Sequence, residues 1–172
     1  MEGFMLRRPD ESMTEEIRAY KQAMIDAGSS MDGTSSLRRM DVSEWLAHLS
    51  RVAAADTDGL VQASQFVYVR EKDGRIVGMI DVRHRLNDYL REFGGHIGYS
   101  VRPDERRKGY ASSMLADTLD YCRELGINRV MISCLVGNEA SRRTILKNGG
   151  VFDSTVHEPD ENVDLERYWI TL

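Results

Sequence analysis

The sequence predicts one mixed α/β domain, and three observations support this prediction. The chain has 172 residues, which fits a single domain with a substantial core. Apolar residues make up 41% and charged residues 30% of it, a globular rather than a disordered composition. Helical and strand patterns alternate along the chain, with no internal repeat and no domain boundary.

The first 60 residues are predicted to form a short strand and two helices. Residues 3–7 can form a strand that ends at Arg8-Pro9. Ser12 and Glu15 fit a capping box that opens a helix, and Gly28 ends that helix. Residues 29–36 form a polar loop. A second helix begins at Asp41, with apolar residues at helical spacing up to residue 52.

Strands follow in the middle of the chain. Residues 66–69 and 76–82 are predicted to pair as a hairpin around the Asp73-Gly74 turn. Residues 86–95 form a polar connection, and residues 96–101 form the next strand, which stops at Pro103.

The last third alternates helices and strands. An amphipathic helix spans about residues 109–125, and Gly126 ends it. The apolar run 129–136 is a buried strand, and Asn138 caps a helix that reaches residue 147. Residues 151–152 and 168–170 are expected to be two short strands around an acidic loop.

Charge and composition exclude several classes of protein. The formal net charge of −5 argues against a sequence-independent nucleic-acid binder. Cys122 and Cys134 lack a C-x-x-C spacing and a nearby His cluster, so neither a metal site nor a disulfide framework is expected. No apolar run is long enough to span a membrane, and no small-residue cleavage site follows the first residues, so a soluble cytoplasmic protein is expected.

The most informative segment is a basic turn between a strand and a helix. Residues 106–111 read R-x-x-G-x-A and precede the helix that starts near Gly109. Unpaired N–H groups and the helix dipole make such a turn an anion site, although basic strand-to-helix turns also occur without a ligand. The sequence has no G-x-x-x-x-G-K-[ST], no G-x-G-x-x-G after a strand and no G-x-S-x-G.

This segment resembles the Q/R-x-x-G-x-G/A signature of the GNAT superfamily of acyl-CoA-dependent N-acetyltransferases. The runs 138–141 (NEAS) and 146–150 (LKNGG) are similar to the second half of that signature, and the order of elements fits as well. Residues 83–90 and 94–99 further resemble a bacterial subgroup of these enzymes. The resemblance implies one domain over residues 1–172, with a mostly antiparallel sheet of about seven strands that splays between strands 4 and 5, and about four flanking helices.

The resemblance also implies acetyl-CoA as co-substrate, with no metal and no nucleic-acid partner. Its pyrophosphate would lie on the N–H groups of residues 106–111, and its pantetheine arm would run along residues 99–101. Direct attack by an amine would follow in a ternary complex. The residues expected to contact the cofactor are Tyr99, Ser100, Val101, Arg106, Arg107, Lys108, Gly109, Tyr110, Ala111, Ser112, Asn138 and Ser141.

The catalytic groups of many relatives fall on unusual residues here. A tyrosine on the fourth helix often acts as general acid, and that register holds Ile145. A glutamate on the fourth strand often acts as base, and that register holds His96. His96 is therefore the candidate base, because its ordinary pKa suits proton transfer near neutrality; a purely structural histidine is the alternative. Tyr110 is a weaker catalytic candidate, and a water chain is a third.

The acceptor side offers mixed charges. Six Asp or Glu residues and no Lys or Arg lie between Gly150 and Arg167, so an acidic rim could attract a cationic amine. Arg83 and Arg85 could hold a substrate carboxylate, or pair with Asp88 and Glu92. The candidate acceptor-binding residues are Arg83, His84 and Tyr89.

Three functions fit these observations. A small-molecule or amino-acid-like acceptor is favoured. The alternatives are acetylation of a protein N-terminus or lysine, and a non-catalytic acyl-CoA sensor. Residues 168–170, taken as an edge strand, are compatible with a homodimer.

Overall fold

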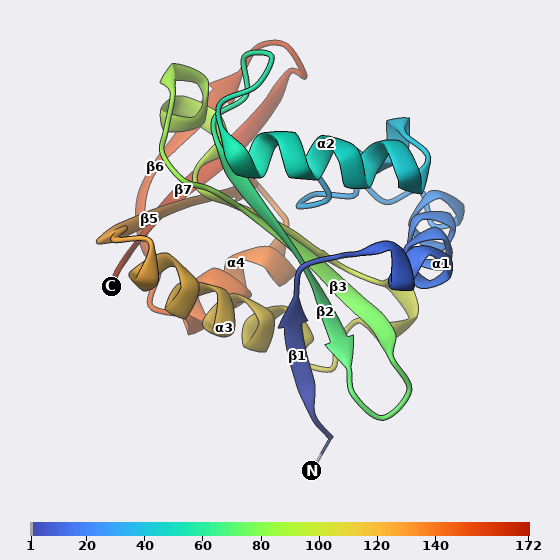
Figure 1. The fold of residues 1–172 in the computed structure, drawn as a ribbon. Coiled ribbons are helices and arrows are strands. Elements are labelled where there is room, and N and C mark those ends of the chain that lie inside the picture. The colour runs from blue at the N-terminus through green and yellow to red at the C-terminus, as the bar shows by residue number, and fades with distance from the viewer. Residues whose placement is uncertain (1) are drawn as a thin grey trace.

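The computed structural model describes residues 2–172, and its elements follow the predicted order (Figure 1). The first half contains β1 (Phe4–Arg7), α1 (Thr14–Asp26), α2 (Val42–Ala54), β2 (Ala63–Arg70), β3 (Arg75–Arg83) and β4 (Ile97–Val101). The second half contains α3 (Tyr110–Glu124), β5 (Arg129–Leu135), α4 (Glu139–Lys147), β6 (Val151–Glu158) and β7 (Val163–Thr171). The α/β fold predicted from the sequence is confirmed.

The strands form two antiparallel sheets that part between β4 and β5. One sheet has the order β1-β2-β3-β4 and the other β5-β7-β6. The expected splay between the fourth and fifth strands is thus a complete separation of the two hydrogen-bonded ladders. Figure 1 shows α1 and α2 on one side of the first sheet and α3 and α4 on the other.

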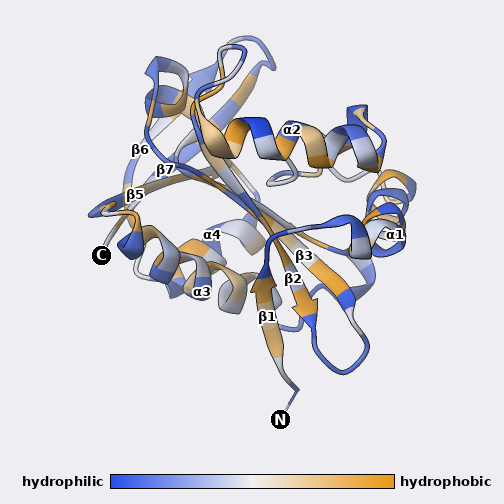
Figure 2. Ribbon diagram, viewed as in Figure 1, coloured by the Kyte–Doolittle hydropathy of each residue, from blue (hydrophilic) through white to orange (hydrophobic). Residues whose placement is uncertain are grey.

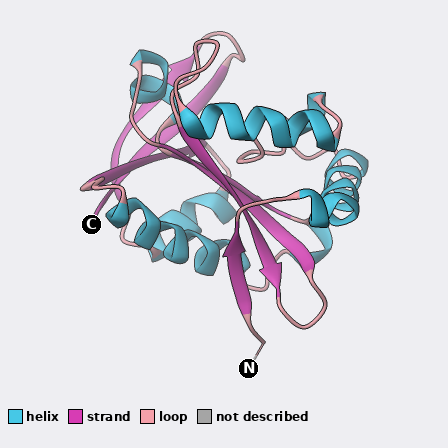
Figure 3. Cartoon of the chain, viewed as in Figure 1, coloured by secondary structure: helices cyan, strands magenta, loops and turns pink. Residues whose placement is uncertain are grey.

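Two apolar cores lie on the two faces of the first sheet. Val67 and Val69 of β2 pack with α1 and α2, whereas Phe66 and Tyr68 pack with α3 and the second sheet. Successive side chains of a strand point to opposite faces, so both faces of β2 are buried. Figure 2 accordingly shows hydrophobic residues concentrated on β1, β2 and β3, and Figure 3 shows the loops that surround them.

The helix boundaries are set by local capping, with one correction. Asp41 accepts a hydrogen bond from the Glu44 N–H at the start of α2, as predicted. The capping box at Ser12 is wrong: a 3₁₀ turn (Glu11–Met13) precedes α1, and Asp10 caps it by accepting from the Ser12 N–H. Asp10 is the better acceptor because its carboxylate is charged.

The C-terminal hairpin and the connection before β4 also differ from the prediction. The expected short strands at 151–152 and 168–170 are β6 and β7, which continue through most of the acidic segment. Residues 168–170 lie in the middle strand of the second sheet, so the edge offered for a homodimer is not theirs. The polar connection contains a π-helical turn at Leu90–Gly94. None of the helices in residues 2–172 has the length and apolar content of a membrane span.

The loop between α1 and α2 crosses β4 at a pair of glycines. A Cβ added at Gly33 would lie 2.3 Å from the carbonyl oxygen of Gly98, and Gly33 has a φ of +72°. The crossing therefore needs a residue without a side chain that also tolerates the left-handed region. It fixes residues 31–36 against the strand beside the site described below.

We expect Gly33→Ala to destabilise the fold by more than a left-handed backbone alone explains. A left-handed non-glycine residue costs about 1–2 kcal/mol, and the clash with Gly98 adds to this cost. Gly74→Ala is the matched control, because Gly74 has a φ of +69° and open space around its Cβ position. Chemical denaturation measures both variants, and equal losses would contradict the close approach.

Candidate functional site

The two sheets are joined at one point, the residue before β4. The His96 N–H donates to the Met131 carbonyl at 2.8 Å, and the Met131 N–H donates to His96 Nδ1 at 3.0 Å. Beyond this point β4 pairs only with β3 in the described chain. The pair of bonds therefore holds β4 to β5 where the two strands begin to diverge.

This geometry gives His96 a structural role. Its side chain is buried, and this burial, together with the charge of Arg83, lowers its pKa to about 4. The ring is then neutral near pH 7, with Nδ1 as acceptor and Nε2 carrying the proton. A general base needs a free lone pair, and the lone pair of Nδ1 is already occupied. The role of base expected for His96 does not fit this arrangement.

The divergence leaves the outer edge of β4 open. Antiparallel pairing alternates, and the Arg102 N–H bonds Val77 on β3. Tyr99 and Val101 therefore turn their N–H and C=O groups away from β3. Arg106 Nε donates to the Val101 carbonyl at 3.0 Å, so the remaining groups at this edge are those of Tyr99 and the Val101 N–H.

The turn after β4 presents a row of unpaired amides. The N–H groups of residues 107–112 donate to no backbone carbonyl of residues 2–172. Arg107 and Gly109 both have left-handed backbones, with φ of +62° and +82°. Alternating conformations of this kind turn successive N–H groups toward one point, and the α3 dipole favours negative charge there. Nothing lies within 4 Å of a Cβ position at Gly109, so a ligand can approach the main chain.

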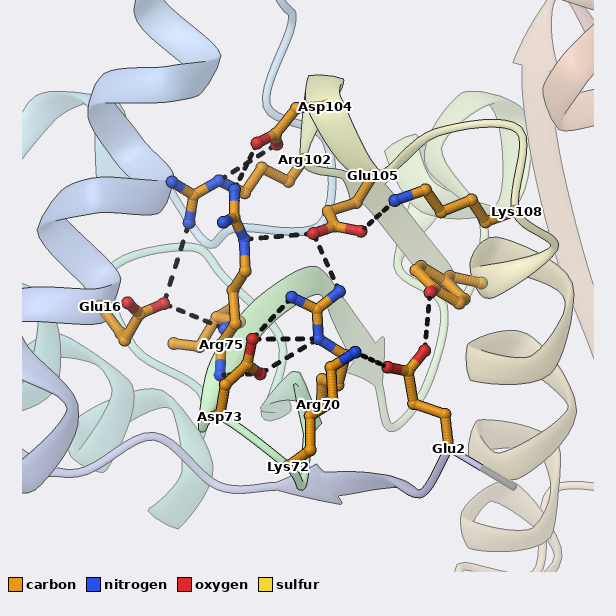
Figure 4. Close-up of polar contacts among 12 residues, drawn as sticks. Glu2, Glu16, Arg70, Lys72, Asp73, Arg75, Arg102, Asp104, Glu105 and Lys108 are labelled. Carbon is orange, nitrogen blue, oxygen red and sulfur yellow. Dashed lines mark hydrogen bonds and ion pairs between the residues drawn. The ribbon is translucent and has the colours of Figure 1, made fainter.

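The buried carboxylate of Glu105 anchors this turn (Figure 4). Glu105 is only 4% exposed, and its oxygens lie 3.0 Å from Arg70, 3.2 Å from Arg75 and 2.8 Å from Lys108. Burial would raise the pKa of Glu105, but hydrogen bonds from Lys108 and Arg70 outweigh it and the net shift is downward. Glu105 therefore stays ionised and ties the turn to the β2–β3 hairpin.

The same network removes Lys108 from the predicted set of cofactor-binding side chains. Its ammonium points toward Glu105 (Figure 4), and it does not line the cavity in front of the turn. The Tyr110 hydroxyl is also engaged elsewhere, since it donates to Glu2 at 3.3 Å. A catalytic role for that hydroxyl is therefore not supported by its position.

Among the described residues, two cavities lie near β4. The first cavity has a volume of about 670 Å³ and lies between the turn after β4, β4 itself and α4. Four basic side chains line it, Arg106, Arg107, Arg143 and Lys147. Except for Lys108, every residue predicted to contact the cofactor lines it: Tyr99, Ser100, Val101, Arg106, Arg107, Gly109, Tyr110, Ala111, Ser112, Asn138 and Ser141. The structure thus brings two segments of the motif together around one space.

The sequence analysis missed Arg143 and Lys147. Both lie on α4 four residues apart, which places them on one face of the helix. This spacing was a usable signal, because Ala140 and Thr144 on the same face also line the cavity. This face of α4 lines the cavity together with the turn that carries the unpaired N–H groups of residues 107–112.

The start of α4 is connected to β4 through Tyr99. Asn138 Oδ1 accepts from the Ser141 N–H at 3.2 Å, the predicted cap, and the Tyr99 hydroxyl lies 2.7 Å from Ser141 Oγ. Burial raises the pKa of Tyr99 to about 12, so its phenol is protonated at neutral pH. Ile145 is fully buried in the core and faces away from the cavity.

A second cavity of about 490 Å³ lies beside the point where the loop between α1 and α2 crosses β4, and Gly33 of that loop lines it. Asp32 lines both cavities. Asp81, Arg83 and Tyr89 also line the second one. Two of the three predicted acceptor-binding residues, Arg83 and Tyr89, are therefore present there.

The other predicted acceptor contacts lie elsewhere. His84 Nε2 lies 2.8 Å from Ser64 Oγ, and His84 does not line the second cavity. β3 ends at Arg83, and His84 in the bend that follows directs its ring to Ser64. Arg85 pairs with Asp56 rather than with Asp88 or Glu92.

The acidic segment 150–167 lies close to the second cavity, because burial and then the charges of Glu158, Glu161 and Asp160 raise the pKa of Tyr89, which lines that cavity. None of the residues of this segment lines that space. Glu158 is buried and accepts from the N–H groups of Asp160 and Glu161, so it shapes the β6–β7 turn. The negative charge in the cavity comes from Asp32 and Asp81, which the sequence analysis missed. The lone carboxylate of Asp81 in an apolar strand was the available signal.

The chain is similar to known proteins in both sequence and fold. The family model for an acetyltransferase (GNAT) domain matches residues 4–151. No curated protein matches the sequence significantly.

Three solved structures illustrate the likeness in fold. A ribosomal-protein-S5-alanine acetyltransferase from Vibrio fischeri is 18% identical, with a TM-score of 0.76, over 99% of this chain and 94% of that one. RimJ from Mycobacterium smegmatis, in complex with CoA-disulfide, is 21% identical, with a TM-score of 0.72, over 98% and 81%. A putative acetyltransferase from Salmonella typhimurium, with its cofactor acetyl-CoA, is 17% identical, with a TM-score of 0.67, over 98% and 94%.

We expect His96 to make the fold acid-sensitive. Its pKa is about 4 in the folded protein and 6.5 as the ordinary value, so the unfolded chain binds its proton first as pH falls. The stability linked to His96 is complete above pH 6.5 and is lost as pH drops toward 4, a change on the order of 3 kcal/mol.

His96→Asn tests this expectation, because Asn Oδ1 can replace Nδ1 as acceptor for Met131 and does not titrate. Unfolding free energies measured at pH 7 and pH 4 should differ less in this variant than in the wild type. His96→Ala should be less stable than His96→Asn at both pH values, since the Met131 N–H loses its partner. Identical pH dependence in wild type and His96→Asn would rule out the assignment.

Proposed function

Because the chain belongs to the GNAT acetyltransferase family, we propose that it moves an acetyl group from acetyl-CoA to the primary amine of a small-molecule or amino-acid-like acceptor. The observation that carries this proposal is the amide row of residues 107–112, which opens onto a cavity that continues to the free edge of β4. The protein is an acyl-CoA N-acetyltransferase by family, and the acceptor and the roles of single residues are our proposals.

The residues around the first cavity fit the chemistry of acetyl-CoA. Its pyrophosphate needs N–H donors and positive charge, which the turn at Gly109 and the four basic side chains offer. A volume of about 670 Å³ is in the range of small-molecule and cofactor sites. When bound, acetyl-CoA supplies an activated thioester; the protein has to bind it, orient it and handle protons.

The open edge of β4 is the proposed guide for the pantetheine amides. Tyr99 and the Val101 N–H remain available there, while Arg106 holds the Val101 carbonyl. An outward N–H at this edge can also stabilise the negative charge that develops on the carbonyl oxygen during attack. These main-chain groups are rigid because β3 pairs with the other edge of β4.

Acetyl transfer forms one N–C bond and breaks one C–S bond. One proton must leave the attacking nitrogen, and one must reach the departing sulfur. We assign the second task to Tyr99, because its protonated phenol lines the first cavity beside α4. Its hydroxyl lies 3.2 Å from the Ser141 carbonyl and 2.7 Å from Ser141 Oγ, and it would have to turn from these partners to reach the sulfur. Ile145, at the register of the usual tyrosine, is core, and the Tyr110 hydroxyl is bound to Glu2.

We place the acceptor in the second cavity, which touches the first at Asp32. This arrangement brings the two substrates together beside β4 and supports direct transfer in a ternary complex. Its volume of about 490 Å³ suits a small molecule better than a folded partner. We therefore favour a small acceptor over a protein lysine or N-terminus.

We further propose that residues 1–172 act as one catalytic domain in the cytoplasm. Cys122 and Cys134 are both buried and free, which suits a reducing compartment. Neither thiol takes part in the proposed reaction.

Gly109→Glu should abolish binding of acetyl-CoA, because it places a side chain and a negative charge against the amide row. Gly126→Glu is the matched control: Gly126 has a φ of +78° and open surroundings, and it lies beyond the other end of α3. Calorimetric titration with acetyl-CoA measures both. Retained affinity in the Gly109 variant would remove the assigned site.

Tyr99→Phe should lower kcat by about 10²-fold or more, the usual contribution of a general acid. Its affinity for acetyl-CoA should change little, because the main chain of β4 is unaltered. Release of CoA thiol gives the rate and titration gives the affinity. An unchanged kcat would assign the proton to another donor or to water.

A further inference from the structure

We propose that the second cavity selects primary amines that carry an apolar or aromatic body and no carboxylate, with Asp32 and Asp81 receiving the ammonium group. This inference rests on the proposed function and narrows its acceptor class. It excludes free amino acids, which the charges in the sequence alone leave open.

Asp81 is the strongest feature of the cavity. It lies near the end of β3 and is 5% exposed. Oδ1 accepts from the Gly98 N–H at 3.1 Å, whereas Oδ2 accepts no hydrogen bond from residues 2–172. The closest cation to Oδ2 is Arg83, at 3.6 Å. Burial raises the pKa of Asp81, and the charge of Arg83 offsets this only in part. An ammonium in the cavity would donate to Oδ2 and favour the ionised carboxylate.

Arg83 lines the cavity with a side chain that is 25% exposed, and it already has partners within the protein. One of its guanidinium nitrogens donates to the carbonyls of Gly94 and Gly95 at 3.4 and 3.5 Å, and another faces Asp81. The other basic side chain among the described residues of the lining is His48. A carboxylate next to the reacting amine would therefore lie close to Asp32 and Asp81, where like charges repel.

The rest of the lining combines apolar side chains with the polar residues Thr34, Ser35, Ser36 and Asn87. Leu60 and Tyr89 are each 50% exposed, in a cavity that they line. Val52, Val61 and Leu90 contribute further apolar surface. An acceptor whose body is aliphatic or aromatic would bury these side chains, and this burial is favourable at about 25 cal/mol per Å².

The position of the carboxylates suits the reaction. Asp81 contacts Gly98, the residue before Tyr99 on β4, and Asp32 lines both cavities. An ammonium held by these two groups lies beside the strand along which we place the thioester arm. One of the carboxylates can take the proton that the nitrogen loses when the N–C bond forms.

Matched acceptors test the selectivity. The first set is phenethylamine, phenylalanine and phenylalaninamide; the second is tyramine and tyrosine. We expect kcat/KM for each amine, and for the amide, to exceed that of the matched amino acid at least tenfold. The amide separates charge from size, because it keeps a substituent of similar volume without the negative charge.

Variants of Asp32 and Asp81 test whether these carboxylates bind the amine. Asp81→Asn keeps an acceptor for the Gly98 N–H and should lower kcat/KM for the amines at least tenfold, as should Asp32→Asn. Asp88→Asn is the control, because Asp88 is fully exposed, next to lining residues, and outside the cavity; its rates should equal those of the wild type. Thermal unfolding and acetyl-CoA titration show whether each variant is folded and binds its co-substrate.

The outcomes separate this inference from the proposed function. Amino acids acetylated as fast as their matched amines, or an Asp81→Asn variant with wild-type rates, would overturn the selectivity and leave the transferase standing. A panel in which acetyl-CoA binds but no amine reacts would overturn it as well. Absence of acetyl-CoA binding in the wild type would overturn the proposed function itself.

Discussion

The architecture of the site depends on one point of attachment between two sheets. His96 and Met131 exchange two hydrogen bonds just before β4, and beyond them β4 and β5 separate. The bonds are buried, so they are not exchanged for bonds to water, and the lowered pKa of His96 keeps its ring in the accepting form. If β4 and β5 paired along their length, the edge of β4 would be occupied and the first cavity would not exist. If they were not joined here, the position of α4 relative to β4 would depend on the shared apolar core and on the contact between Tyr99 and Ser141.

The turn after β4 shows how a strained segment is held in place. Arg107 has a left-handed backbone without being glycine, a conformation that persists only where the surroundings impose it. Glu105 provides that constraint, because it connects the turn to Arg70 and Arg75 on the β2–β3 hairpin. Lys108 belongs to this support, and Arg106 holds the end of β4. Two basic residues of the motif thus shape the turn, while Arg107, Arg143 and Lys147 leave positive charge on the cavity.

Features fixed by neighbours in sequence could be predicted, and features fixed by distant residues could not. The Asn138 cap, the break at Gly109 and the apolar faces of α2 and α3 depend on residues within one or two turns. His96, by contrast, takes its role from Met131, which lies 35 residues further along the chain. The cavity that Asp81 lines is formed in part by a loop about 50 residues earlier in the chain. The lengths of β6 and β7 were underestimated because most of β6 is exposed and the first half of β7 is rich in charged residues, so their side chains lack the apolar pattern by which a strand is recognised.

The burial of Glu105 has a consequence for the response of the protein to ionic strength. Dissolved ions screen exposed charges strongly and buried pairs only weakly. The buried pair of Glu105 with Arg70 holds the turn, whereas Arg107 and Lys147 are exposed to solvent. Added salt therefore weakens the long-range attraction between the cavity and an anion without relaxing the backbone that receives it. The backbone geometry of the turn is therefore almost independent of ionic strength, whereas the attraction of the cavity for an anion depends on it.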